Sequence, residues 1–127
     1  REGHGGSIIN TASLTGHIVN QAPLGHTQDD SSYGVSKAGV LYFTKHFASQ
    51  VIQYGIRVNS VSPAIATAPG LHAECPRRSL ECYQNTQPIM RMAQVEELQG
   101  AVLYLASDAS TYTVGQDILI DGGHANW

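Results

Sequence analysis

A helix pattern followed directly by a strand pattern occupies residues 32–63, SYGVSKAGVLYFTKHFASQVIQYGIRVNSVSP. Over residues 32–54, apolar side chains return at intervals close to the 3.6 residues of one α-helical turn. Gly55 is a typical helix stop, and the β-branched residues of 56–62 favour a buried strand. Pro63 cannot donate to a sheet ladder, so the strand should end there. The apolar residues of the predicted helix are Val35, Ala38, Leu41, Phe43, Phe47, Ala48 and Val51.

Three further elements flank this unit. Short apolar runs predict strands at residues 7–12 and 117–121, and a second amphipathic helix is predicted at 94–107. Residues 71–85, between the strand that ends at Pro63 and the helix predicted at 94–107, are expected to hold one or two short helices. The order strand–helix–strand–helix–strand predicts an α/β domain, with a parallel sheet between two layers of helix. A sheet of three strands would leave one apolar edge bare, which indicates that further strands belong upstream.

Composition narrows the class of protein. The chain has 127 residues, a formal net charge of −3 and only 13% charged residues, and it contains no Lys/Arg run. This argues against nucleic-acid binding, which needs clustered positive charge. No apolar stretch approaches the roughly 20 residues of a membrane helix. The first residues have no apolar core of a secretory signal, so we expect a cytoplasmic protein that does not bind membranes.

Cysteines and histidines give no sign of a metal site. Cys75 and Cys82 could form a disulfide, but two reduced thiols fit a cytosolic protein better. The six histidines are scattered, without a second ligand at a familiar spacing. We interpret most of them as ordinary surface or loop residues.

Tyr33 and Lys37 are the first candidates for chemistry. They are four residues apart at the start of the predicted long helix, so they share one face. A free tyrosine has a pKa near 10, and a neighbouring ammonium lowers it. Such a pair could exchange a proton with an alcohol or carbonyl oxygen. Ser13 ends the first predicted strand, at the sheet edge where ligands bind, and could hydrogen-bond the same oxygen. Taken alone, the pair would be better explained as a half-buried tyrosine beside a solvated lysine.

Four segments resemble signatures of the short-chain dehydrogenase/reductase family, in the family's order and over nearly the whole chain. They are residues 9–16 (INTASLTG), similar to the strand with Asn-x-Ser-Ser and a following Gly; residues 33–40 (YGVSKAGV), similar to Tyr-x-Ala-Ser-Lys-Ala-Ala; residues 55–63 (GIRVNSVSP), similar to the strand that ends in Pro-Gly; and residues 105–110, 115–116 and 121–123, similar to the closing segment. The resemblance implies one partial domain, 1–127: the C-terminal part of a Rossmann-like doubly wound sheet, with the N-terminal strands missing.

The resemblance also implies roles for the motif residues. Tyr33 would be the proton donor in reduction and the base in oxidation, Lys37 would lower the pKa of Tyr33 and hold the ribose hydroxyls of the nicotinamide nucleotide, and Ser13 would orient the substrate oxygen. Pro63, Ile65 and Thr67 would line the nicotinamide side of the cofactor. Hydride transfer itself would be the work of NADP, with NAD not excluded.

A finer similarity suggests a substrate class. Residues 16–21 (GHIVNQ), the long spacer before Tyr33 and the ending with Trp127 resemble the fungal mannitol dehydrogenase and sorbose reductase branch. That branch implies a polyol or ketose substrate. A secondary-metabolite ketoreductase could share the same frame.

Departures from the family pattern keep other interpretations open. The glycine-rich turn that seats the pyrophosphate is expected upstream of the chain. Ala64 stands where the family has glycine after Pro63, with one residue fewer before Thr67. The chain could therefore be a truncated, inactive fragment, or an interaction module that pairs with intact subunits through the long helix. At full length the resemblance implies a homo-oligomer, a dimer or a tetramer. Core packing remains the simpler role for the helix aromatics Tyr42, Phe43 and Phe47.

Overall fold

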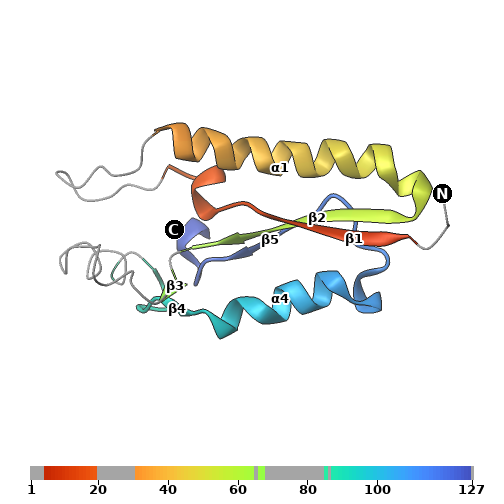
Figure 1. The fold of residues 1–127 in the computed structure, drawn as a ribbon. Helices are drawn as coiled ribbons and strands as arrows, with labels where there is room; N and C mark the ends of the chain where they lie inside the picture. Colours follow the sequence, from red (N-terminus) through yellow and green to blue (C-terminus); the bar gives the residue numbers. More distant parts are fainter. Residues whose placement is uncertain (1–4, 20–30, 65, 68–84, 86, 127) are drawn as a thin grey trace.

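Three parallel strands form the centre of the molecule, and one long helix covers each face of their sheet (Figure 1). The computed structural model describes residues 5–19, 31–64, 66–67, 85 and 87–126. The strands are β1 (Gly6–Thr11), β2 (Ile56–Pro63) and β5 (Asp117–Ile120), in the order β1-β2-β5. Gly6 pairs with Ile56 at one end, and Pro63 pairs with Ile120 at the other. The predicted α/β class and its parallel sheet are confirmed.

The long helix α1 (Ser31–Val51) packs on the first face of the sheet and continues into the short 3-10 helix η2 (Ile52–Tyr54). Gly55 ends this run with a left-handed φ of 74°, the conformation that favours glycine at a helix end, and the chain turns back into β2. The buried residues of α1 are Thr44 and Ala48. Thr44 Oγ1 accepts a hydrogen bond from Asn10 Nδ2 at 2.9 Å, which fixes the helix over β1.

Several apolar residues of α1 that were expected in the core are on the surface. Val35 is 72% exposed, Phe43 is 52% exposed, and the neighbouring Tyr42 is 71% exposed. Phe43 stacks on the half-buried Phe47 with ring centroids 5.2 Å apart. The prediction of core packing for the helix aromatics is therefore wrong for Tyr42 and Phe43. The physical reason is that the residues of α1 buried against the sheet, Thr44 and Ala48, are small, so the helix lies close to the sheet. The sheet has only three described strands and covers only part of the apolar face of the helix.

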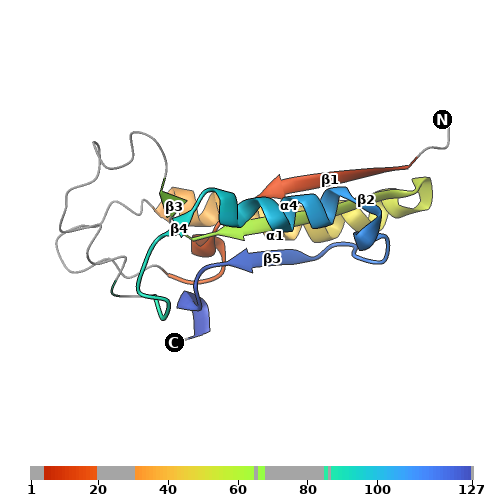
Figure 2. The ribbon, with the colours of Figure 1, turned by 90° about the horizontal axis from the view of Figure 1, so that it is seen from below.

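The second helix, α4 (Glu96–Ala106), crosses the opposite face, and Figure 2 shows it running along the strands. Its Leu105 side chain is fully buried, while Val95 and Val102 of the same predicted face stay about two-fifths exposed. The carbonyl of Leu105 accepts hydrogen bonds from Ser7 Oγ at 2.7 Å and from both terminal nitrogens of Arg57 at 3.2 Å. A cation at a helix C-terminus is favourable, so Arg57 ties this end of α4 to the sheet.

The remaining elements are short. They are the 3-10 helices η1 (Leu14–Gly16), η3 (Asp108–Ser110) and η4 (His124–Asn126), and the paired strands β3 (Ala66–Thr67) and β4 (Ala93–Gln94). The sequence did not predict the β3–β4 pair. The short helices predicted around residues 71–85 fall almost wholly outside the described residues, as do Cys75 and Cys82.

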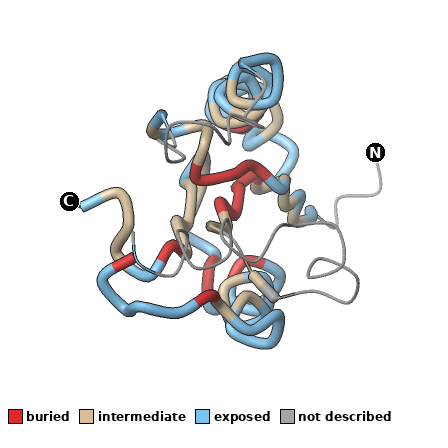
Figure 3. Tube along the Cα trace, turned by 90° about the vertical axis from the view of Figure 1, so that its left-hand side faces the viewer, coloured by how far each residue is buried: buried red, intermediate tan, exposed pale blue. Residues whose placement is uncertain are grey.

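Among the described residues, the middle strand β2 holds more buried residues than any other element, and Figure 3 colours the chain by burial. Four consecutive residues, 58–61, are at most 5% exposed, and two of them are polar. The Asn59 amide donates to Thr113 O at 2.8 Å and accepts from the Gln116 N–H at 2.9 Å. A buried amide needs such partners, and here they order the chain just before β5.

The N-terminus of α4 is held by Glu97, whose carboxylate accepts two bonds of 2.7 Å from Arg91 and one from the Gln94 N–H. The hydrogen bonds from Arg91 lower the pKa of Glu97 from 4.5 to about 2.

A carboxylate whose pKa is lower in the folded chain than in the unfolded chain stabilises the fold at any pH above its unfolded pKa. This stabilisation is lost as the pH falls through the folded pKa. Between pH 4.5 and about 2, the stability difference between wild type and Glu97→Gln should therefore shrink, and urea midpoints measured at stepped pH would test this. Glu96→Gln is the matched control, because Glu96 forms no ion pair with the described residues. Equal pH dependence of both variants would contradict the assignment.

Candidate active site

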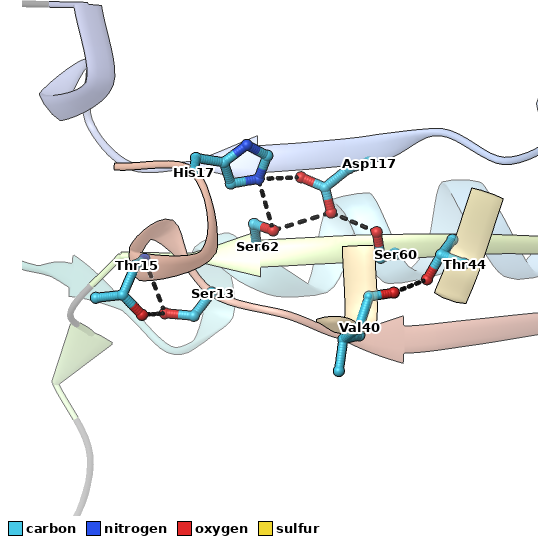
Figure 4. A network of polar contacts seen from close by, with 8 residues as sticks. All are labelled: Ser13, Thr15, His17, Val40, Thr44, Ser60, Ser62 and Asp117. Carbon is cyan, nitrogen blue, oxygen red and sulfur yellow. Dashed lines mark hydrogen bonds and ion pairs between the residues drawn. The ribbon is translucent and has the colours of Figure 1, made fainter. Parts of the chain in front are cut away.

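Ser13 lies where β1 ends and η1 begins. The strand ladder continues to Ala12, whose N–H donates to Val61 O at 2.8 Å, and Ser13 then caps η1. Ser13 Oγ accepts from the Thr15 N–H at 3.3 Å and from Thr15 Oγ1 at 3.0 Å (Figure 4). Within the described part of the chain, its own hydroxyl proton has no acceptor. The side chain can therefore donate that proton to a substrate oxygen.

Tyr33 and Lys37 lie on one face of the first turns of α1, as their spacing predicted. Lys37 Nζ is 5.6 Å from the centre of the Tyr33 ring, close enough for a cation–π contact. Lys37 Nζ also donates to the carbonyl of Thr11 at 3.0 Å, at the carboxyl end of β1. The Tyr33 side chain is 44% exposed, so a ligand can reach its hydroxyl.

Backbone packing holds Ser13 and the Tyr33–Lys37 turn together. A Cβ atom on Gly16 would lie 2.9 Å from the carbonyl carbon of Lys37, so only glycine allows this approach of η1 to α1. A Cβ atom on Gly34 would lie 3.4 Å from the Thr15 oxygen, which shows the same closeness from the helix side. The structure thus gathers Ser13, Tyr33 and Lys37 at the carboxyl end of β1, where parallel sheets bind ligands.

The predicted cofactor-side residues are only partly described. Pro63 ends β2, and the N–H of the following Ala64 donates to Ile120 O at 2.9 Å, so the missing glycine does not break the ladder. Ile65 lies outside the described residues. Thr67 is placed in β3, but its side chain lies outside the description.

A cavity of about 110 Å³ opens beside Ala64, beyond the ends of β2 and β5. Its other walls include Ile120, Gly122, Gln87 and Arg91. Ser13, Tyr33 and Lys37 are not among the described residues that line it, so this cavity is separate from the three catalytic candidates.

A polar cluster next to η1 was missed from the sequence. His17 Nε2 lies 2.9 Å from Asp117 Oδ2 and 3.1 Å from Ser62 Oγ, and Asp117 Oδ1 accepts from Ser60 and Ser62 (Figure 4). His17 is therefore an exception among the histidines, most of which were interpreted as ordinary surface or loop residues. His17 and Asp117 are 100 residues apart in the sequence, and periodicity carries no signal for such a contact.

Two other classes of site are not represented among the described residues. None of their histidines, cysteines and carboxylates gather in a group of three or more that could bind a metal ion. None of their helices is both long and apolar enough to cross a bilayer.

Known proteins resemble this chain throughout its length. A family model described as "Enoyl-(Acyl carrier protein) reductase" matches residues 1–125. An NADP-dependent mannitol dehydrogenase from Hypocrea jecorina is 39% identical over 124 residues, covering 98% of this chain and 44% of the relative. A D-arabinitol 2-dehydrogenase (ribulose-forming) from Scheffersomyces stipitis is 37% identical over 129 residues, covering 96% of this chain and 43% of the relative.

A solved structure agrees with these relatives. The crystal structure of a short-chain type dehydrogenase/reductase from Mycobacterium marinum superposes with a TM-score of 0.85 at 43% identity. The alignment covers 96% of this chain and 45% of that one, so the chain spans less than half the length of the proteins that it matches. These matches show that the chain belongs to the short-chain dehydrogenase/reductase family.

Proposed function

We propose that this chain is the catalytic half of an NADP(H)-dependent oxidoreductase that interconverts a polyol and a ketose. The observation that carries the proposal is the meeting of Ser13, Tyr33 and Lys37 at the carboxyl end of β1. Relatives whose names give mannitol and arabinitol as substrates support the polyol class, and the name of the former supports NADP.

The residues present fit a nicotinamide nucleotide. Lys37 Nζ has three donors and uses one on Thr11 O, so two remain for the hydroxyls of a ribose. When bound, the coenzyme supplies or accepts the hydride. Pro63 ends β2, and Ile65 and Thr67 come after it in the chain; together they would form the wall on the nicotinamide side.

The chain's own residues would handle the proton. In reduction, the Tyr33 hydroxyl gives its proton to the carbonyl oxygen of the ketose while the Ser13 hydroxyl donates a hydrogen bond to the same oxygen. The positive charge of Lys37 stabilises the negative charge left on the Tyr33 oxygen. In oxidation the same groups act in reverse, with Tyr33 as the base.

The exposed face of α1 supports a homo-oligomer. Tyr42 and Phe43 lie on this helix and are more than half exposed, and aromatic side chains are enriched in protein interfaces. We therefore propose that α1 packs against a second subunit in the full-length enzyme.

The full-length protein is expected to oxidise mannitol or arabinitol with NADP and to reduce the matching ketose with NADPH. Steady-state absorbance of NADPH measures both directions. The H. jecorina mannitol dehydrogenase is the positive control, and a chimera with residues 1–127 in place of its matching segment tests the catalytic half separately. If full-length protein and chimera both fail on every polyol–ketose pair while the control turns over, the proposed function is wrong.

A further inference from the structure

His17 connects the turn that carries Ser13 to the opposite edge of the sheet. It follows η1 directly, and its N–H closes that turn on Leu14 O at 2.9 Å. Its side chain reaches over the sheet to β5, where Nε2 contacts Asp117 Oδ2 at 2.9 Å (Figure 4). Ser62 of the middle strand lies between them, at 3.1 Å from the same nitrogen.

The pattern of donors fixes the proton on Nε2. An ionised carboxylate only accepts, so the His17–Asp117 contact needs Nε2–H as the donor. The Ser60 and Ser62 hydroxyls both donate to Asp117 Oδ1, so Ser62 Oγ is left to accept from the same Nε2–H. Each oxygen of the carboxylate therefore has a partner.

This cluster is not a hydrolytic triad. In such a triad the serine and the aspartate contact different nitrogens of the histidine. Here Ser62 and Asp117 share Nε2, and the Ser62 hydroxyl is fully buried and directed at the carboxylate. The arrangement cannot activate a serine for attack, but it can hold the histidine in place.

The turn needs such a support because it is short. η1 has three residues, and its backbone bonds are those from Gly16 to Ser13 O and from His17 and Ile18 to Leu14 O. A single 3-10 turn is only weakly stable by itself. The anchor, in contrast, is rigid, since Ser60 and Ser62 are 0% exposed in the central strand.

We propose that His17, held by Asp117, is a positioning residue that fixes η1 and thereby sets the direction of the Ser13 hydroxyl. The role is indirect, because His17 acts through the turn on Ser13. It rests on the proposed function only in assigning Ser13 to the reaction. The anchoring of the turn can be measured without activity.

The test uses the full-length protein with His17→Leu, which removes the donor, and His17→Gln, which keeps a side-chain N–H. Misplacing a catalytic group by about 1 Å costs on the order of 10- to 100-fold in kcat. We expect a kcat loss of this size for His17→Leu, with KM for the coenzyme unchanged, and a partial recovery in His17→Gln. Tyr112→Leu, which places a leucine at a fully exposed position outside α1 and η1, should leave kcat unchanged.

Combination with Ser13→Ala separates positioning from general damage. If His17 works through Ser13, adding His17→Leu to Ser13→Ala should lower kcat by less than about twofold. Hydrogen exchange supplies a second measurement, since the Gly16 and Ile18 amides should exchange faster in His17→Leu while those of α1 keep their rates.

The outcomes distinguish the two proposals. If His17→Leu lowers kcat by the same factor in the wild type and in the Ser13→Ala variant, the positioning role is overturned. Unchanged hydrogen exchange at the Gly16 and Ile18 amides would overturn it as well. Faster exchange at these amides in a protein without any oxidoreductase activity would retain the anchor and refute the proposed function.

Discussion

Replacing Tyr33 with phenylalanine is expected to lower kcat by about 10²- to 10⁴-fold, the usual contribution of a general acid or base. The substitution removes only the hydroxyl. The ring remains, so the contact of Lys37 with it and the bond of Lys37 to Thr11 O should persist. Steady-state kinetics with a ketose and NADPH measures the loss, and coenzyme titration should show affinity within about twofold of wild type.

Tyr112→Phe is the matched control for this variant. Tyr112 is fully exposed and lies outside α1, so loss of its hydroxyl touches none of the three candidate groups. It should retain the activity of wild type. A Tyr33→Phe enzyme that keeps most of its activity would show that the proton comes from another group, and the assigned role of Tyr33 would be wrong.

Replacing Leu105 with alanine should cost about 2–5 kcal/mol of folding free energy, the range for a large-to-small change in a core. The Leu105 side chain is fully buried between α4 and the sheet. Leucine and alanine both favour helices, so the loss reports packing and not helix propensity. Urea unfolding of the full-length protein, followed by circular dichroism, measures the shift of the midpoint.

Leu103→Ala provides the comparison on the same helix. Leu103 is 67% exposed, so its truncation should change stability by less than about 0.5 kcal/mol. If the two variants unfold at the same midpoint, the helix does not pack as described.

Local patterns in the sequence predicted the elements well, and they predicted tertiary contacts poorly. The strand that ends at Pro63 and the helix stop at Gly55 follow from the chemistry of single residues, and both are confirmed. The helical periodicity could not distinguish Ala48, which is buried, from Val35, which is exposed, because burial depends on what the fold places opposite each side chain. The two-residue strands β3 and β4 are too short to give any periodic signal.

The same difference between local patterns and tertiary contacts holds for the residues of the candidate site. Tyr33 and Lys37 lie one helical turn apart, so spacing alone predicted their shared face. Ser13 was found through its position at the end of a strand and through the family's motif. The contact of His17 with Asp117 joins the turn after the first strand to the last strand, and the type and spacing of these residues along the chain did not indicate it.

The outer edge of β1 bears on how the proposed active site is completed. Among the described residues β1 hydrogen-bonds with β2 alone, so its other side offers free backbone donors and acceptors, and Ser13 lies at the tip of this outermost strand. A strand that extends the sheet there would run alongside the Ser13 hydroxyl and form one wall of the proposed active site. Under the proposed function, completing the sheet would also complete this site, so we expect turnover to require the strands beyond β1.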